Sequence, residues 1–246
     1  MAIRILDVTD ETSFRLLPPC ADPRFDHRTC DYWEDADRGL KVARPGWLEP
    51  AAPVAEPPPL VEEPFNPFAP PPKASADSFN AFALDDDPEF DNPFAPSRPA
   101  KRVVPSGAPR KLALIARGLA VFGSYAKVAL EGDRPVAYAQ FGPLSAYPRA
   151  QRLRDLYPQL PASPLPAVIT CIATTADARR QGHAKRLVAE VCLDLSDRGF
   201  AAVEAYPERG AAPDATSAAT PEFWLGAGFE IAVDDDRFPV VRRELG

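Results

Sequence analysis

Hydrophobic and polar positions recur along the chain with two different periods, which predict where strands and helices lie. Apolar residues at every second position are typical of a half-buried strand, whereas a spacing of three and four residues is typical of an amphipathic helix. The shorter period, or an unbroken apolar run, predicts strands over residues 2–8, 124–131, 135–141, 167–174, 200–206, 228–233 and 238–244. The longer period predicts helices over residues 9–17, 108–122, 149–156, 182–198 and 219–226. This order of elements predicts an α/β domain with a mixed sheet flanked by helices.

Turn and capping residues mark several of these boundaries. Gly132-Asp133 stands between two strand patterns and is a hairpin signal. Thr9 or Asp10 is suited to cap the first helix, which Pro18-Pro19 then ends. Gly199 follows the long predicted helix at the position where a glycine commonly terminates one.

Residues 50–100 differ in composition from the rest of the chain. They hold 14 of the 31 prolines and nine acidic against two basic residues, and this balance of −7 equals the net charge of the whole chain. Proline removes a backbone donor, and a segment with few β-branched residues cannot bury a core. The composition predicts a disordered acidic linker between residues 1–49 and residues 101–246, which together form the folded part.

The linker repeats one short phrase, N-[PA]-F-A, within residues 64–96, with phenylalanines at Phe68, Phe82 and Phe94. Exposed aromatic side chains are costly in water, so one interpretation is a set of anchors for a protein partner or for the folded body. The other interpretation is low-complexity drift with incidental phenylalanines. Spacings of 14 and 12 residues exclude a regular solenoid.

Composition excludes several classes of protein. The apolar runs are far shorter than the ~18 residues that a membrane helix requires, and the N-terminus lacks the hydrophobic core of a signal peptide. Four cysteines are not a disulfide framework in a chain of this length, and Cys171 and Cys192 lie in apolar segments as small buried side chains. No basic stripe indicates nucleic acid. We therefore expect a cytoplasmic protein that binds neither nucleic acid nor membrane.

Small and basic residues gather where the predicted strand 167–174 leads into the helix 182–198. They are Arg179, Arg180, Gly182, Ala184, Lys185 and Arg186. Amides at a helix N-terminus are unpaired and point outward, so small residues let a phosphate approach them and cations strengthen the attraction. The pattern favours an anion site over the alternative, an ordinary turn with solvated arginines.

The same segment resembles a known signature. Arg179-x-x-Gly182-x-Ala184 is similar to the R/Q-x-x-G-x-G/A motif of the GNAT superfamily of N-acetyltransferases. About 40 residues downstream, the segment from Glu222 to Glu230 resembles the helix-to-strand junction of that family. The resemblance covers residues 101–246 and extends to residues 1–17. It implies a GNAT-like α/β fold, with a mixed and mostly antiparallel sheet that the linker interrupts.

The resemblance implies that the chain transfers an acetyl group from acetyl-CoA to a primary amine of a small molecule or peptide, by direct attack in a ternary complex. The residues that would bind acetyl-CoA are Ile172, Ala173, Thr174, Arg179, Arg180, Gln181, Gly182, His183, Ala184 and Lys185. Amides from Arg180 to Lys185 would hold the pyrophosphate. The main chain of residues 172–174 would pair with the pantetheine and polarise the thioester carbonyl. We expect the His183 side chain to point to solvent.

The chain departs from the family pattern at the catalytic acid. Many members have a tyrosine in the second motif where this chain has Trp224, and an indole N–H cannot protonate a thiolate. Glu204 and Tyr206 share one face of the strand 200–206 and are our candidates for general base and general acid. The alternative is a solvated polar strand face. A second hypothesis follows: a catalytically silent CoA-binding scaffold that engages a partner through the linker phrases.

Residues 27–34 resemble a Cys-x-x-Cys-x-Phe-Trp-Glu element of a bacterial subgroup of the family, with His27 in place of the first cysteine. Three side chains that could bind zinc lie within eleven residues: Cys20, His27 and Cys30. A structural zinc site needs a fourth ligand, and this spacing matches no familiar site. We therefore expect no metal, but two free cysteines and a surface histidine.

Overall fold

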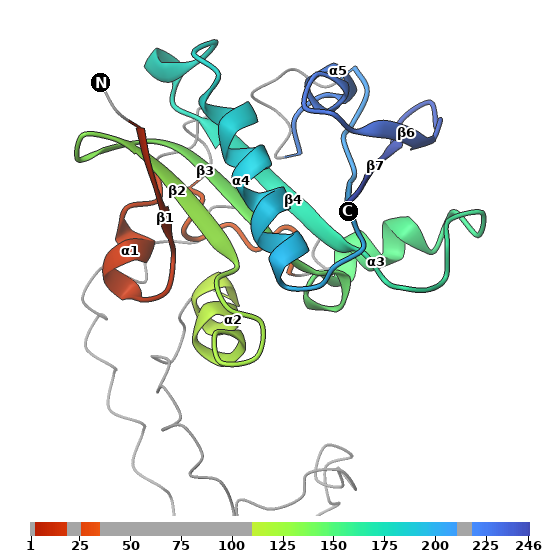
Figure 1. Cartoon of the computed structure of the whole chain (residues 1–246), viewed down its shortest axis with the longest axis horizontal. Helices are drawn as coiled ribbons and strands as arrows, with labels where there is room; N and C mark the ends of the chain where they lie inside the picture. Colours follow the sequence, from red (N-terminus) through yellow and green to blue (C-terminus); the bar gives the residue numbers. More distant parts are fainter. Residues whose placement is uncertain (1–2, 19–25, 35–109, 211–217) are drawn as a thin grey trace, which may run out of the picture. The chain divides into compact units, whose positions relative to one another are not determined.

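The computed structural model describes residues 3–18, 26–34, 110–210 and 218–246 (Figure 1). Contacts divide the chain into one unit formed by Met1–Glu49 with Lys101–Gly246 and a second unit, Pro50–Ala100. The second unit, with its predicted disorder and its phenylalanine phrases, lies outside the described residues. The account below concerns the first unit.

Seven strands form one mixed sheet in the order β1-β2-β3-β4-β5-β7-β6 (Figure 1). Their bounds are Ile3–Asp7 (β1), Ala126–Glu131 (β2), Arg134–Pro143 (β3), Ala167–Thr174 (β4), Ala202–Ala205 (β5), Glu230–Val233 (β6) and Val240–Glu244 (β7). Neighbouring strands are antiparallel except for the parallel pair of β4 and β5. The predicted fold class, a mixed and mostly antiparallel sheet with helices, is confirmed.

The helices also lie where the sequence period predicts them. They are Glu11–Arg15 (α1), Arg110–Gly118 (α2), Pro148–Arg154 (α3), His183–Asp197 (α4) and Pro221–Leu225 (α5), with short 3₁₀ turns at Leu144–Ala146 and Ala176–Ala178. Asp10 caps α1 by accepting a hydrogen bond from the backbone N–H of Ser13. Gly132 turns the β2–β3 hairpin with a φ of +63°, and Gly199 follows α4 with a φ of +83°. These residues therefore mark the boundaries of their elements as the sequence indicates.

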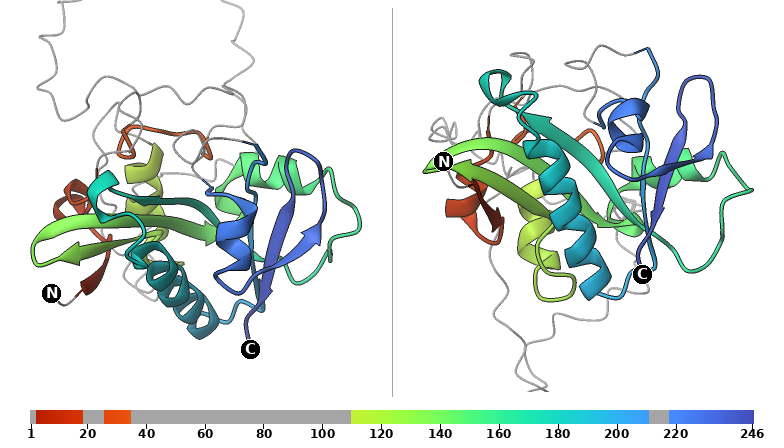
Figure 2. Two further views of the ribbon diagram at one scale, coloured as in Figure 1. Left: turned by 90° about the horizontal axis from the view of Figure 1, so that it is seen from above. Right: turned by 45° about the horizontal axis from the view of Figure 1, so that its top comes forward.

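The sheet separates two cores, because its side chains alternate between two faces. On one face, α4 and Trp224 of α5 cover residues such as Phe141 and Ile169. We call this the α4 face. The opposite face, which we call the α2 face, is covered by α1, α2, α3 and residues 26–34. Figure 2 shows α4 on one side of the sheet and α2 on the other.

β4 has two irregularities in the middle of the sheet. Its register with β3 shifts between Gln140 and Phe141, so that Thr170 is an extra residue of β4 at a bulge. Its pairing with β5 is limited to Ala167 and Val168. Bulges bend a strand and are frequent beside active sites. Beyond Val168, β4 and β5 therefore separate, while β3 continues to pair with β4 as far as Thr174.

Within the described residues, no helix is both long enough and apolar enough to cross a membrane.

Candidate functional site

The loop that joins β4 to α4 brings the predicted anion-binding residues together. β4 ends at Thr174, a 3₁₀ turn follows, and α4 begins at His183. The residue before α4, Gly182, has a φ of +82°, a left-handed conformation that favours glycine. A Cβ atom at Gly182 would meet no other atom within 4 Å. The glycine therefore serves the backbone conformation and leaves the surface above it open.

The first amides of α4 point out of the helix at this open surface. No side chain caps the N-terminus of α4 with a hydrogen bond, and the first intrahelical bond recorded here runs from Arg186 N to Gly182 O at 3.0 Å. The amides of His183, Ala184 and Lys185 precede that bond in the first turn. Together with the helix dipole, they form a site suited to an anion.

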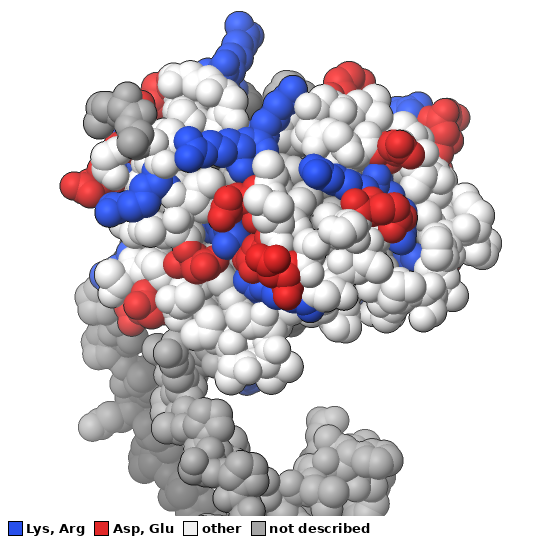
Figure 3. Space-filling view, viewed as in Figure 1, with Lys and Arg blue, Asp and Glu red and all other residues white. Residues whose placement is uncertain are grey.

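Basic side chains surround this N-terminus. Arg180, Lys185 and Arg186 are exposed, and Arg179 is half-buried. Figure 3 shows Lys and Arg side chains gathered around the start of α4, whereas charges of both signs mix along the rest of the helix. The local field is therefore positive where the amides point outward.

His183 does not point to solvent, and that expectation is wrong. Its side chain is buried, and its Nε2 lies 3.3 Å from Oε1 of Gln181. Gln181 in turn donates from Nε2 to the carbonyl oxygen of Asp177 at 3.1 Å. The imidazole thus braces the loop from beneath, because the first turn of α4 directs this position toward the core.

The separation of β4 from β5 leaves one edge of β4 without a strand partner among the described strands. This edge includes Ile172, which is buried, and Ala173 and Thr174, which are half-buried. An unpaired strand edge can bind an extended chain through its main-chain groups. Since this edge leads directly into the loop before α4, an extended ligand with an anionic end could contact both.

Glu204 and Tyr206 lie together on the α2 face, and both are buried. Glu204 receives one hydrogen bond from each of three side chains: Arg242 to Oε1 at 2.8 Å, Arg154 to Oε2 at 3.1 Å and the Tyr206 hydroxyl to Oε2 at 2.8 Å. Burial, followed by the charge of Glu204, raises the pKa of Tyr206 well above its ordinary value. Two guanidinium groups and a phenol hydroxyl occupy both carboxylate oxygens of Glu204, which favours a structural role for it.

Trp224 occupies the core of the α4 face. Its ring is fully buried, stacks edge-on against Phe229 at 4.8 Å between centroids, and donates from Nε1 to Ala218 O at 2.6 Å. The donor is therefore occupied. These contacts explain a tryptophan here by packing.

A second group of polar side chains is buried on the α2 face. We call it the α2-face cluster: His27, Asp31, Glu34, Lys111, Tyr138, Gln140 and Cys171. It joins the segment 26–34 to α2, β3 and β4. Gln140 donates from Nε2 to Glu34 Oε1, the Tyr138 hydroxyl donates to Gln140 Oε1 at 3.3 Å, and Lys111 Nζ donates to His27 O at 3.0 Å. The segment 26–34 is thus fixed to the middle of the sheet by polar contacts.

Burial governs the charges of this cluster. It raises the pKa of the Glu34 carboxyl, although Lys111 and Gln140 oppose the shift. It lowers the pKa of His27 to about 3, and the charge of Lys111 adds to that effect. For Lys111 itself burial acts to lower the pKa, but Glu34 and other anionic groups raise it on balance. The cluster therefore holds a neutral imidazole, an ammonium and a carboxyl that binds its proton more tightly than usual.

His27 is therefore not the surface histidine that the sequence suggested. Its ring packs on Tyr138 at 5.3 Å between centroids, and its Nδ1 lies 3.8 Å from Cys171 Sγ. Cys20 lies outside the described residues. Among the residues that are described, no group of His, Cys, Asp and Glu side chains is arranged to hold a metal ion.

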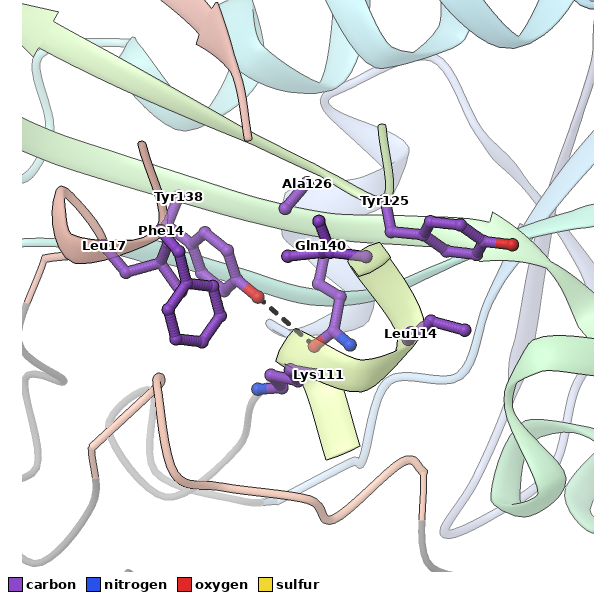
Figure 4. A pocket seen from close by; sticks show the side chains of 9 residues that line it. Phe14, Leu17, Lys111, Leu114, Tyr125, Ala126, Tyr138 and Gln140 are labelled. Atoms are coloured by element: carbon purple, nitrogen blue, oxygen red, sulfur yellow. Dashed lines mark hydrogen bonds between the residues drawn. The ribbon is translucent and has the colours of Figure 1, made fainter. Parts of the chain in front are cut away.

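A small cavity borders the cluster between α1, α2 and β3 (Figure 4). Lys111, Tyr138 and Gln140 supply its polar groups, and apolar side chains of α1 and α2 such as Phe14 and Ile115 form the rest of its wall. The periodicity of the sequence does not predict the α2-face cluster. Its one sequence signal is the Trp33-Glu34 pair at the end of residues 27–34.

No protein-family model matches this chain, and no curated protein matches it. Among solved structures, it is similar to a protein of Desulfovibrio desulfuricans assigned to the GNAT acetyltransferases, with 21% identity over 55% of this chain and 79% of the other and a TM-score of 0.37. It is also similar to the PaiA N-acetyltransferase of Thermoplasma acidophilum, which was solved with coenzyme A, with 12% identity over 54% and 68% of the two chains and a TM-score of 0.38. An N-acetyltransferase of Staphylococcus aureus Mu50 gives 15% identity over 49% and 67% and a TM-score of 0.34. Because these scores are low, the function is argued from the site of this chain.

Proposed function

We propose that the chain is an N-acetyltransferase of the GNAT type, which moves the acetyl group of acetyl-CoA to an amine. One observation carries the proposal: beyond Val168 one edge of β4 has no partner among the described strands, and β4 leads through one short loop into a basic, uncapped helix N-terminus. An extended pantetheine arm that ends in a pyrophosphate has the two chemical parts that such a surface can bind. The signature Arg179-x-x-Gly182-x-Ala184 lies at that junction.

In this proposal the loop holds the anionic end of the cofactor. The main-chain amides from Arg180 to Lys185 bind the pyrophosphate, and the side chains of Arg179, Arg180 and Lys185 add positive charge. Gln181 and His183 brace the loop through the hydrogen bond between them. Gly182 keeps the approach open, since it has no side chain.

The edge of β4 holds the reactive end. The main chain of Ile172, Ala173 and Thr174 pairs with the pantetheine, and an amide of this stretch polarises the thioester carbonyl. The bulge at Thr170 redirects the strand just before that stretch. The acceptor is a primary amine, of a small molecule or a peptide, that attacks the carbonyl directly. The roles of Glu204 as base and Tyr206 as acid stay predictions. The hydrogen bond between these two side chains and the two arginine contacts of Glu204 also fit a purely structural role.

Thermal unfolding with acetyl-CoA tests the binding half of the proposal. A ligand at 100 times its dissociation constant adds about 2.7 kcal/mol to the free energy of unfolding, a shift of roughly 5–10 °C for a domain of this size. Release of free CoA thiol in the presence of a panel of amines tests the transfer half. Binding without thiol release would favour the scaffold hypothesis, and no shift at millimolar acetyl-CoA would exclude both.

A further inference from the structure

The α2-face cluster has no part in the acetyl-CoA site proposed above, yet it is built around a buried carboxylate. Glu34 is 6% exposed. The cluster residues that shift its pKa come from three different segments of the chain. Charged groups buried in proteins are costly unless they are paired or used. A carboxylate in this position therefore needs a reason.

Glu34 is linked to the part of β4 where the reacting carbonyl is proposed to lie. Its Oε1 accepts the hydrogen bond of Gln140 Nε2, and Gln140 pairs with Cys171 on β4 directly at the bulge. Ile172 follows Cys171 and begins the stretch proposed to bind the pantetheine. Cys171 lies one to three residues before the residues of that stretch. Since a strand rises ~3.3 Å per residue, the distance along β4 is roughly 3–10 Å.

The groups that shift the pKa of Glu34 come from α2, from β3 and from its own segment. Lys111 of α2 supplies a cation and Asp31 of its own segment an anion, while Gln140 of β3 donates a hydrogen bond. The hydroxyls of Tyr138 and Tyr147 feel the charge of Glu34, and burial together with that charge raises their pKa values. Among the described residues, the cation that acts on Glu34 is the ammonium of Lys111, whereas Glu204 is bound by two guanidinium groups.

From this placement we infer that Glu34 is the general base of acetyl transfer, an inference that rests on the proposed function. The amine nitrogen forms a bond to the thioester carbonyl carbon, and Glu34 takes the proton that the nitrogen loses. The carbon–sulfur bond then breaks with its electron pair on sulfur. Glu34 passes the proton to solvent, and the thiolate takes one up, so that the products are the amide and free CoA.

Gln140 and Lys111 are positioning residues in this account. Gln140 fixes the carboxylate over the bulge, and both residues favour its ionised form. A base must be ionised to act, so turnover falls as pH decreases through the pKa of Glu34. Because burial raises that pKa, the fall lies above the ordinary glutamate range near 4.5. Removing the Gln140 donor raises the pKa further and moves the fall to higher pH.

The test measures CoA release against pH for the full chain and for Glu34→Gln, with the amine that gives the fastest wild-type rate. General base catalysis contributes about 10²–10⁴-fold, so kcat of Glu34→Gln falls by at least 100-fold. The fall of the wild-type kcat at acidic pH, which we call the acidic limb, disappears in this variant. The acetyl-CoA thermal shift of this variant stays that of the wild type. Glu34→Asp, which keeps a carboxylate, loses less and keeps the acidic limb. Gln140→Leu keeps the limb but displaces it to higher pH.

Two results would overturn the inference while leaving the proposed function intact: Glu34→Gln within tenfold of wild type with an unchanged limb, or a limb that Glu204→Gln removes instead. If Glu34→Gln does not fold, the acidic limbs of Glu34→Asp and Gln140→Leu test the inference instead. A purely structural Glu34 predicts that neither variant displaces the acidic limb along the pH axis. Failure of the proposed function appears earlier, as a wild-type chain that releases no CoA with any amine.

Discussion

Glu34 and Glu204 are buried carboxylates on the same face of one sheet, and their partners differ in charge. Glu204 is held by Arg154, Arg242 and Tyr206, so both of its oxygens are bound by donors and its charge is neutralised twice. In the part of the chain that the structure describes, Glu34 accepts a hydrogen bond from the neutral amide of Gln140, and the ammonium of Lys111 acts on its charge. The first environment holds the carboxylate between two guanidinium groups and a phenol hydroxyl.

The second environment raises the affinity of the carboxyl for its proton. Burial raises the pKa of Glu34, while Lys111 and Gln140 keep the ionised form within reach. A residue type alone does not reveal which of these roles it has. The partners do, and they come from segments far apart in the chain: residues 26–34, α2 and β3 for Glu34, and α3 and β7 for Glu204. Two changes test the two environments and a third tests the core of the α4 face, beginning with the largest effect on stability.

Glu204→Leu should lower the free energy of unfolding by about 3–5 kcal/mol, because it leaves the buried guanidinium of Arg154 without its carboxylate. Urea unfolding measures the loss. Glu244→Gln is the control: Glu244 also pairs with Arg242, but its side chain is 71% exposed, and the change should cost less than about 0.5 kcal/mol. A loss below 1 kcal/mol for Glu204→Leu would contradict the structural role of Glu204.

His27→Gln should remove a pH dependence that belongs to the α2-face cluster. Since the folded-state pKa of His27 is lowered from 6.5 to about 3, its unfolded form binds a proton that the folded form rejects, and stability falls as pH decreases below 6.5. Between pH 7 and pH 5 the wild type should lose about 2 kcal/mol through this residue.

Urea unfolding at several pH values measures the slope. The variant should lose it, whereas His183→Gln, which replaces the other of the two histidines in the chain, should keep it. If the wild type and His27→Gln changed in stability by the same amount between pH 7 and pH 5, His27 would not be buried as described.

Trp224→Phe should cost roughly 1–2 kcal/mol, since it leaves the buried carbonyl of Ala218 without the indole donor. The pH profile of CoA release should not change, because the indole packs in the core of the α4 face. A tenfold loss of kcat at unchanged stability would instead assign Trp224 a role in the reaction.

The sequence predicts the strands and helices well, because each depends on a local period and on local turn residues. Gly132, Asp10 and Gly199 mark the boundaries of their elements where the pattern indicates. The loop before α4 is equally local, so its glycine and cations could be recognised before the fold was known. His183 was misjudged because an exposed loop was assumed, whereas the first turn of α4 directs this side chain inward.

The α2-face cluster could not be predicted in this way. Gln140 lies 106 residues after Glu34 in the chain, and no period relates them. The segment 26–34 has no regular secondary structure, so its pattern of apolar and polar residues did not predict that it covers the sheet. Glu204 and Tyr206 were correctly placed on one face, but the two arginines that neutralise Glu204 were not foreseen because α3 and β7 supply them.

Acetyl-CoA binding to two matched glycine variants tests the central claim most directly. Gly182 and Gly199 stand at opposite ends of α4, with φ values of +82° and +83°, and a Cβ at either would meet nothing within 4 Å. Leucine should therefore impose similar backbone strain at both. The account predicts that Gly199→Leu keeps the acetyl-CoA thermal shift and that Gly182→Leu abolishes it. A shift in Gly182→Leu equal to that of Gly199→Leu would contradict an acetyl-CoA site at the N-terminus of α4.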